Sequence, residues 1–227
     1  MKEIIFSERI KEVAPNLKVL QIEADIDNSP TPDDLWKEIE KSAEELKDKF
    51  ALQELNKRPS IAATRKAYKN AGKDPNRYRP SAEALGRRII NGKGIYRLTT
   101  LIDIINQISI ITGYSIGGFD ADKIDGDILL LDIGTDNDKF EAIGRGTLNI
   151  EGLPVYRDKS GGIGTPTSDE ERTKLTLDTH HLLMIVNIYG EEMETKEVEE
   201  MTRNLLSRYA SLKNFESIVY ENFQPVN

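Results

Sequence analysis

The stretch that decides the fold is RPSAEALGRRIINGKGIYRLTTLIDIINQIS, residues 79–109. Its apolar spacing predicts two helices, over residues 81–90 and about 100–112, separated by a glycine-containing turn. The second helix is strongly apolar, whereas the first carries Arg87 and Arg88. Positive charge therefore stands next to an apolar helix, and this arrangement requires a structural or functional reason.

Charge is segregated along the chain. The 227 residues include 31 Lys and Arg and 39 Asp and Glu, which gives a formal charge of −8. Residues 57–97 nevertheless contain twelve basic residues and two acidic ones, a net charge of +10, which leaves −18 for the remainder. A basic segment within an acidic chain is typical of a surface that binds a polyanion. The alternative is a solvated helix pair whose charges are spread over its surface.

The composition excludes several classes of protein. The absence of cysteine excludes disulfides, thiolate nucleophiles and zinc ribbons. No run of about eighteen apolar residues is present, and the first residues lack the apolar core and cleavage site of a signal peptide. We therefore expect a cytoplasmic protein with no membrane partner, no metal and no cofactor.

The rest of the sequence predicts helices in its first half and strands in its second. Short strands at residues 3–6 and 17–26 precede two helices, one capped by Thr31 and reaching about Leu55, the other ending near Gly72. Further strands are expected at 124–133, 139–146, 153–158 and 181–190, with an exposed loop at 159–174 and a last helix at about 193–212. This segregation predicts an α+β fold in which helices pack on a largely antiparallel β-sheet.

Two common kinds of catalytic site are not supported. His180 and His181, the only histidines, begin a predicted strand and therefore point to opposite faces. A Ser-His-Asp relay or a histidine-rich metal site is not expected from them. The glycine groups 117–118 and 161–164 also lack the spacing of a phosphate-binding loop.

Two further features each allow two interpretations. Tyr68, Tyr78 and Tyr96 alternate with basic residues, so they either stack on unpaired RNA bases or fill the core between helices. Asp103 and Asn106 stand three residues apart and share one face of the apolar helix. They either bond to neighbouring loop backbone and hold the fold, or line a pocket that grips an amino group or a ribose hydroxyl.

Three stretches in order carry a resemblance to a known family. They are residues 79–109 quoted above, then GYSIGGFDADKIDGDILLLDIG, then GLPVYRDKSG. Together they resemble the tRNA-editing module of the bacterial phenylalanyl-tRNA synthetase β subunit, its third and fourth B domains, and especially free-standing relatives of that module. The resemblance covers roughly residues 60–190. We expect one editing-type domain over residues 1–227, with a strand–helix extension at 1–56 and an acidic helix at about 193–212.

In that family the domain hydrolyses the ester of tRNA that carries tyrosine in place of phenylalanine. The resemblance implies an acyl pocket, whose helix residues are Asp103 and Asn106 and whose loop residues, at the entry to the sheet, are Gly117, Gly118 and Asp120. It also implies a surface for the tRNA acceptor end, formed by Tyr78, Arg79, Ser81, Arg87, Arg88 and Lys93. No covalent catalytic residue is expected, because a positioned water can attack the acyl carbon.

Two departures from the family pattern bear on specificity. Gly117 stands where the synthetase module has a pocket histidine, and Ile185 aligns with a glutamate that discriminates the tyrosine hydroxyl. Loss of both groups predicts loss of selectivity for tyrosine, since recognition of one hydroxyl needs a buried polar partner. Whether Glu151, Asp158 or Thr165 reaches the pocket stays open at the level of sequence.

Two functions follow from the sequence. The first is a free-standing deacylase that binds the acceptor end of tRNA and hydrolyses a mischarged aminoacyl ester in trans. The second is a non-catalytic module that kept the fold and binds tRNA, another RNA or a small amino-acid-like ligand. DNA is not an expected partner in either case.

Overall fold

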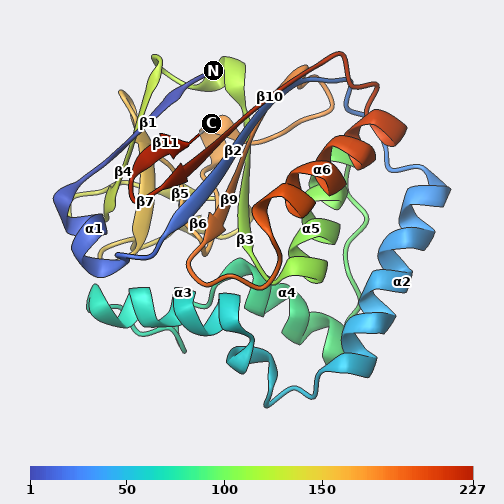
Figure 1. Ribbon diagram of the computed structural model, residues 1–227, viewed down its shortest axis with the longest axis horizontal. Helices are drawn as coiled ribbons and strands as arrows, with labels where there is room; N and C mark the ends of the chain where they lie inside the picture. The colour runs from blue at the N-terminus through green and yellow to red at the C-terminus, as the bar shows by residue number, and fades with distance from the viewer. Residues whose placement is uncertain (227) are drawn as a thin grey trace.

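The computed structural model describes residues 1–226, whose strands form two main sheets and one short hairpin (Figure 1). The four-stranded sheet has the order β1-β4-β7-β8 and the five-stranded sheet the order β11-β10-β2-β9-β3. The strands are β1 Glu3–Phe6, β2 Lys18–Asp25, β3 Ser115–Asp120, β4 Ile128–Ile133, β5 Glu141–Ala142, β6 Gly146–Thr147, β7 Pro154–Asp158, β8 Gly161–Gly164, β9 His181–Ile188, β10 Asn214–Glu221 and β11 Gln224–Val226. Neighbouring strands pair antiparallel except β1 and β4.

Helices α2, α4, α5 and α6 lie on one side of the molecule and the four-stranded sheet, with α1 beside it, lies on the other (Figure 1). The helices are α1 Glu8–Val13, α2 Asp33–Lys49, α3 Pro59–Asn70, α4 Ser81–Ile90, α5 Thr100–Thr112 and α6 Thr195–Tyr209. Helices α2, α5 and α6 contribute to the apolar cluster that covers one face of the five-stranded sheet. The expected α+β class, with a largely antiparallel sheet, is confirmed.

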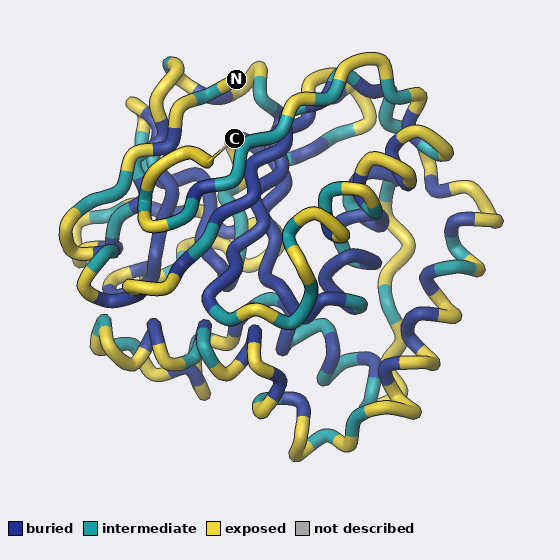
Figure 2. Tube along the Cα trace, in the orientation of Figure 1, coloured by how far each residue is buried: buried dark blue, intermediate teal, exposed yellow. Residues whose placement is uncertain are grey.

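Strands β2, β9 and β3 of the five-stranded sheet are buried on both faces (Figure 2). In β9, Leu182 and Met184 pack toward the helices, whereas Leu183 and Ile185 pack toward the four-stranded sheet. Such double burial explains why HLLMIVNI is an almost continuous apolar run rather than an alternating one. The central layer therefore joins the two halves of the core.

Three expected helix boundaries are wrong. Helix α2 ends at Lys49, and its N-cap is Pro32 rather than Thr31. The Thr31 hydroxyl instead donates a hydrogen bond to the buried carboxylate of Asp103. Ser81 lies inside α4, whose N-cap is Pro80, and its N–H donates to the carbonyl of Pro166 at 2.7 Å. The Thr31 hydroxyl and the Ser81 N–H are thus each bonded to a distant part of the chain, and neither residue is an N-cap.

The expected exposed loop at 159–174 is also wrong, because residues 161–164 form β8 and residues 162–167 are buried. Its glycines permit close packing on aromatic rings. A Cβ at Gly164 would lie 2.6 Å from Phe119 Cζ, and one at Gly162 would lie 3.0 Å from Phe140 Cδ2. The high glycine content, which is unusual for a strand, is thus explained by the packing of β8 on two aromatic rings.

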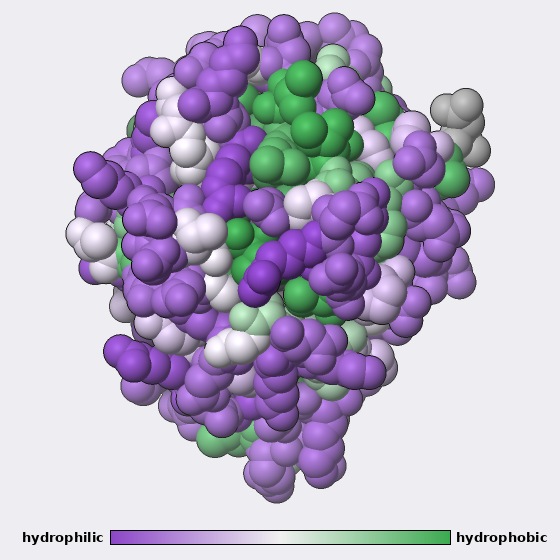
Figure 3. Space-filling model, turned by 90° about the vertical axis from the view of Figure 1, so that its left-hand side faces the viewer, coloured by the Kyte–Doolittle hydropathy of each residue, from purple (hydrophilic) through white to green (hydrophobic). Residues whose placement is uncertain are grey.

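The outer surface of the four-stranded sheet is partly apolar (Figure 3). Ile5 of β1 is 42% exposed and Ile128 of β4 is 49% exposed. This surface lies on the far side of the five-stranded sheet from α5. No helix within residues 1–226 is both long enough and apolar enough to cross a membrane.

Replacement Gly164→Ala tests the packing of β8. We expect the free energy of unfolding to fall by roughly 1–3 kcal/mol, because the new methyl group overlaps the Phe119 ring and the backbone must shift. Chemical denaturation of the wild type and variant measures the loss. In Phe119→Leu/Gly164→Ala the smaller side chain removes the overlap with the ring, whereas the approach of 2.8 Å to Asp169 Oδ1 remains, so the two costs should be less than additive. Additive costs would show that the ring does not limit residue 164.

Candidate acyl pocket and basic groove

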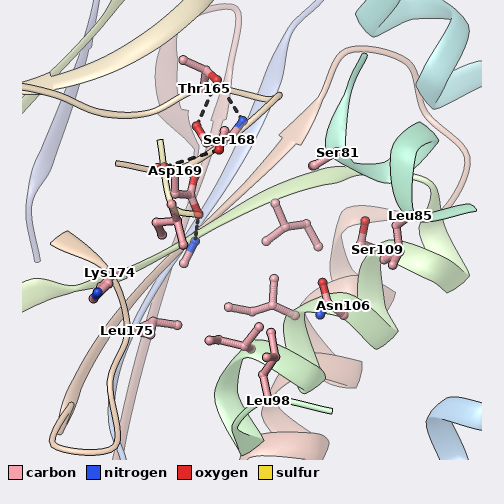
Figure 4. A pocket seen from close by; sticks show the side chains of 15 residues that line it. Ser81, Leu85, Leu98, Asn106, Ser109, Thr165, Ser168, Asp169, Lys174 and Leu175 are labelled. Carbon is pink, nitrogen blue, oxygen red and sulfur yellow. Dashed lines mark hydrogen bonds between the residues drawn. The ribbon is translucent and has the colours of Figure 1, made fainter. Parts of the chain in front are cut away.

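A cavity of about 270 Å³ lies between helices α4 and α5, strand β3 and the segment that follows β8 (Figure 4). Its walls are largely aliphatic, a composition suited to an apolar ligand group. The aliphatic lining residues are Leu85, Leu98, Ile102, Ile105, Ile116, Ile143 and Leu175. Polar lining residues come from α4, α5 and the segment after β8: Ser81, Asn106, Ser109, Thr165, Ser168, Asp169 and Lys174.

A tight turn at residues 165–168 presents the polar wall of this cavity. The Thr165 N–H and hydroxyl both donate to the Ser168 carbonyl, at 2.9 and 3.0 Å. The Thr165 hydroxyl in turn accepts from the N–H groups of Thr167 and Ser168. Pro166 occupies the second turn position, for which its fixed φ is suited. The turn thereby directs the chain back so that Asp169 faces β3 (Figure 4).

The carboxylate of Asp169 is held against β3 with little compensation for its burial. One oxygen accepts from the N–H of Gly118 at 3.2 Å. The residue keeps a partly exposed surface toward the cavity. Burial raises the pKa of Asp169 to about 7, because desolvation outweighs the hydrogen bond from Gly118. A carboxyl group that titrates near neutral pH thus lines the cavity.

The structure brings two of the five expected acyl-pocket residues to the cavity. Asn106 lies on α5 with its side chain directed into the cavity (Figure 4). Gly118 lines the opposite wall, where a Cβ would overlap Ile105. The absence of a side chain at residue 118 therefore lets α5 approach the sheet.

The other three residues lie outside the lining. Asp103 is buried beneath the loop before α5, where it accepts hydrogen bonds from Thr31 and from the N–H of Leu98. Burial raises its pKa, since desolvation outweighs these bonds. Because the Leu98 side chain lines the cavity, Asp103 supports the pocket wall without entering it. The structure matches the alternative in which Asp103 bonds to loop backbone.

Asp120 and Gly117 also differ from expectation. Asp120 ends β3, where it accepts from Thr179 and pairs with Lys123, each at 3.0 Å. Gly117 lies within β3 rather than in a loop, and a Cβ there would point at the Phe119 ring, 2.6 Å from Cζ. Alternation along the strand therefore turns residue 117 away from the face that residue 118 presents to α5.

Ile185, the residue aligned with the specificity glutamate, is fully buried between the two sheets. It pairs with Gly117 across β3 and β9 and belongs to the same side of the central layer as Phe119. The pocket therefore does not contain residue 185. Among the other open candidates, Thr165 lines the pocket, whereas Asp158 pairs with Arg172 at 2.9 Å and Glu151 lies beside a separate cavity.

A basic groove adjoins the pocket and shares Ser81 and Leu85 with it. Five of the six residues expected to hold the acceptor end line this groove: Arg79, Ser81, Arg87, Arg88 and Lys93. Arg145 joins them from the β5–β6 hairpin, a residue that its position in the sequence did not indicate. The groove is a second cavity of about 590 Å³, which opens directly beside the aliphatic pocket.

The three tyrosines of the basic segment have three different environments. Tyr96 is 63% exposed in the groove, with the Arg88 guanidinium 4.0 Å from its ring centre. Tyr68 is buried and shares a hydrogen bond with Thr167 at 2.9 Å. Tyr78, an expected tRNA-binding residue, lies beside another cavity, where Lys73 covers its ring at 3.9 Å. Tyr96, not Tyr78, is the aromatic residue of the groove.

Several cations of the basic segment have structural partners. Arg58 donates to the carbonyls of Ile110 and Ile111 at the end of α5 and pairs with Glu192 at 2.7 Å. Arg65 and Arg87 both pair at 2.8 Å with Glu83, whose side chain is fully buried. Part of the positive charge therefore serves the fold, and another part, from Arg79, Arg87, Arg88 and Lys93, lines the groove.

Replacement Asp169→Asn tests the burial of this carboxylate. The folded-state pKa, about 7, lies above the usual 3.8, so stability is lost as pH rises through this interval. We expect the variant to be more stable than the wild type at pH 8, by roughly 2–4 kcal/mol, and nearly equal to it below pH 4. Urea unfolding at both pH values measures the difference. An equal difference at the two pH values would contradict the buried charge.

Comparison with known proteins gives one family and one solved structure of interest. A model of the B3/4 domain matches residues 63–216. An N-terminal fragment of the phenylalanyl-tRNA synthetase β subunit from Pyrococcus horikoshii is similar to 90% of this chain, at 14% identity and a TM-score of 0.45, and the chain spans 48% of that fragment. No curated protein matches significantly. Since the family model matches about two thirds of the sequence, the chain belongs to the B3/4 domain family, in agreement with its sequence resemblance to the synthetase β-subunit module.

Proposed function

We propose that this chain is an editing domain, which binds the acceptor end of aminoacyl-tRNA in the cytoplasm and hydrolyses a mischarged ester in trans. The observation that carries the proposal is the adjacency of the aliphatic pocket and the basic groove, which share the lining residues Ser81 and Leu85. An aminoacyl ester combines a small acyl group with a polyanionic chain. The small pocket suits the acyl group, and the adjacent cationic groove suits the polyanionic chain.

The groove offers the two kinds of contact that a single-stranded RNA end requires. Arg79, Arg88 and Lys93 are available to phosphates, which Arg and Lys bind by charge and hydrogen bonds. Tyr96 presents an exposed ring on which a base can stack. The RNA would thus lie along α4 and the following turn, with its terminal ester directed past Ser81 into the pocket.

Hydrolysis in this pocket would depend on placement of water rather than on a covalent intermediate. The Gly118 N–H already donates to Asp169, and the Ser109 hydroxyl already donates to the carbonyl of Tyr114 at 2.8 Å. The Asn106 amide points into the cavity from α5 (Figure 4). We assign to its N–H group the stabilisation of the acyl oxygen as negative charge develops on it.

One observation favours the second function, a binding module without catalysis. The positions aligned with the family's histidine and glutamate, Gly117 and Ile185, face the core between the two sheets rather than the pocket. Neither His180 nor His181 is among the residues that line the pocket, so no imidazole takes the place of the family's histidine there. Such a module would bind an RNA end or an amino-acid-like ligand and release it unchanged.

Deacylation of misacylated tRNAs, including tyrosyl-tRNA of the phenylalanine acceptor, tests the enzyme directly. We expect the protein at catalytic concentration to accelerate ester hydrolysis, and Asn106→Ala to slow it by about 100-fold or more, because the acyl oxygen loses a donor. Asn137→Ala, in an exposed loop outside both cavities, is the matched control. Hydrolysis at the spontaneous rate across the whole panel would discard the deacylase and leave the binding module.

Charge replacement tests the groove. Arg79→Gln/Arg88→Gln/Lys93→Gln should weaken tRNA binding and make the salt dependence of log Kd shallower by about 2, because three phosphate contacts are lost. Arg87 is left unchanged, since its loss would leave the buried Glu83 with one partner fewer.

The control Lys37→Gln/Lys41→Gln/Lys196→Gln removes the same charge from exposed helix surfaces elsewhere. Fluorescence anisotropy over a range of salt concentrations measures both slopes. Equal slopes for the two triple variants would show that the groove does not hold the RNA.

A further inference from the structure

Asp169 is the one acidic residue in the lining of a cavity with largely aliphatic walls. One carboxylate oxygen accepts from Gly118, and the other lies where a Cβ at Gly164 would be only 2.8 Å away. The glycines of β3 and β8 thus leave room for this group at the wall of the pocket. Seven aliphatic side chains line the same cavity. Such surroundings solvate an ionised carboxylate poorly.

The neighbouring cations are all engaged elsewhere. Lys174, whose residue lines the pocket, pairs through its ammonium group with Glu171. Arg172 forms a bidentate pair with Asp158, and Lys123 pairs with Asp120. Strand β3 contributes only glycine and apolar residues beside the carboxylate, and β8 contributes glycine. Within residues 1–226, no ion pair neutralises Asp169.

A ligand that carries a positive charge would supply the missing partner. We propose that Asp169 binds the α-ammonium group of the aminoacyl ester and that the aliphatic walls select an aliphatic amino-acid side chain. This assignment rests on the proposed function, because the ester is the ligand which that function brings to the pocket. Asn106, across the cavity, then faces the acyl oxygen (Figure 4).

The size of the cavity is consistent with this ligand. At about 270 Å³ it lies just below the ~300–1,000 Å³ of pockets that hold drug-sized molecules. An aliphatic side chain with its α-carbon and carbonyl fills such a volume, while the attached ribose remains at the opening beside Ser81. The raised pKa of Asp169, about 7, agrees with a site that lacks its cation until the ligand arrives.

Matched analogues test the assignment without requiring hydrolysis. The probes are 3′-leucylamido-3′-deoxyadenosine, which has a stable amide and a free amine, and its 4-methylpentanoyl counterpart, which lacks the amine. Calorimetry at pH 7 with the full chain should give at least about tenfold tighter binding of the amine compound. Its binding should also release protons, because the ammonium group lowers the pKa of Asp169.

Asp169→Asn should abolish both the tenfold preference and the proton release, while binding of the 4-methylpentanoyl compound stays the same. Asparagine keeps an oxygen that can accept from Gly118, so the wall should persist. Asp178→Asn, an exposed carboxylate change outside the lining, is the control and should keep the preference. Equal binding of the two probes by the wild type, or an unchanged preference in Asp169→Asn, would overturn the assignment.

Hydrolysis assays separate this inference from the proposed function. Amine-dependent binding that disappears in Asp169→Asn, together with no turnover of leucyl-tRNA or other misacylated tRNAs, supports Asp169 as the ammonium site and rejects the deacylase. Equal turnover of leucyl-tRNA and N-acetyl-leucyl-tRNA supports the deacylase and rejects the ammonium site. Neither binding nor turnover rejects both.

Discussion

Burial of strands β2, β9 and β3 of the five-stranded sheet on both faces is the constraint on which the rest of the structure depends. One face needs helices and the other needs the four-stranded sheet, so the chain must form three layers. Strand β3 is an edge of the central sheet, and the absence of a side chain at Gly118 lets Ile105 of α5 press against it. The segment after β8 closes over the same edge through the pairing of Phe119 with Lys174. The pocket is the space that these three elements leave between them.

The basic segment beside the apolar helix divides into two groups with different roles. Arg58 stabilises the end of α5, whose last carbonyls have no partners within the helix, and Arg65 and Arg87 balance the buried Glu83. Arg79, Arg88 and Lys93, together with Arg87, line the groove along α4. The sequence places both groups in one stretch because α4 and its flanking turns contact the core on one side and solvent on the other. The net charge of the segment does not distinguish the cations that stabilise the fold from the cations that line the groove.

Local sequence predicts the elements better than the site. The patterns predict the apolar helix at about 100–112 and a strand at 181–190, observed as Thr100–Thr112 and His181–Ile188, whereas the expectation of Asn106 in a pocket came from the family resemblance. Gly117 lies outside the cavity lining because residues 115–120 form a strand, in which neighbouring residues face opposite ways. Asp169 was missed since its stretch is rich in glycine and polar residues, a composition typical of exposed loops. Only the packing of β8 on Phe119 and Phe140, a contact between distant parts of the chain, buries it.

Under the proposed function, the polarity of the two adjacent cavities would distinguish an ester from a free amino acid. The pocket contains the carboxylate of Asp169, and the one basic residue in its lining, Lys174, is paired with Glu171. A free amino acid would bring its own carboxylate into this acidic, largely aliphatic space without a cation to receive it. Esterification removes that negative charge and attaches a chain of phosphates, which the groove of Arg79, Arg88 and Lys93 can receive. The charge arrangement therefore favours an amino acid that arrives attached to RNA.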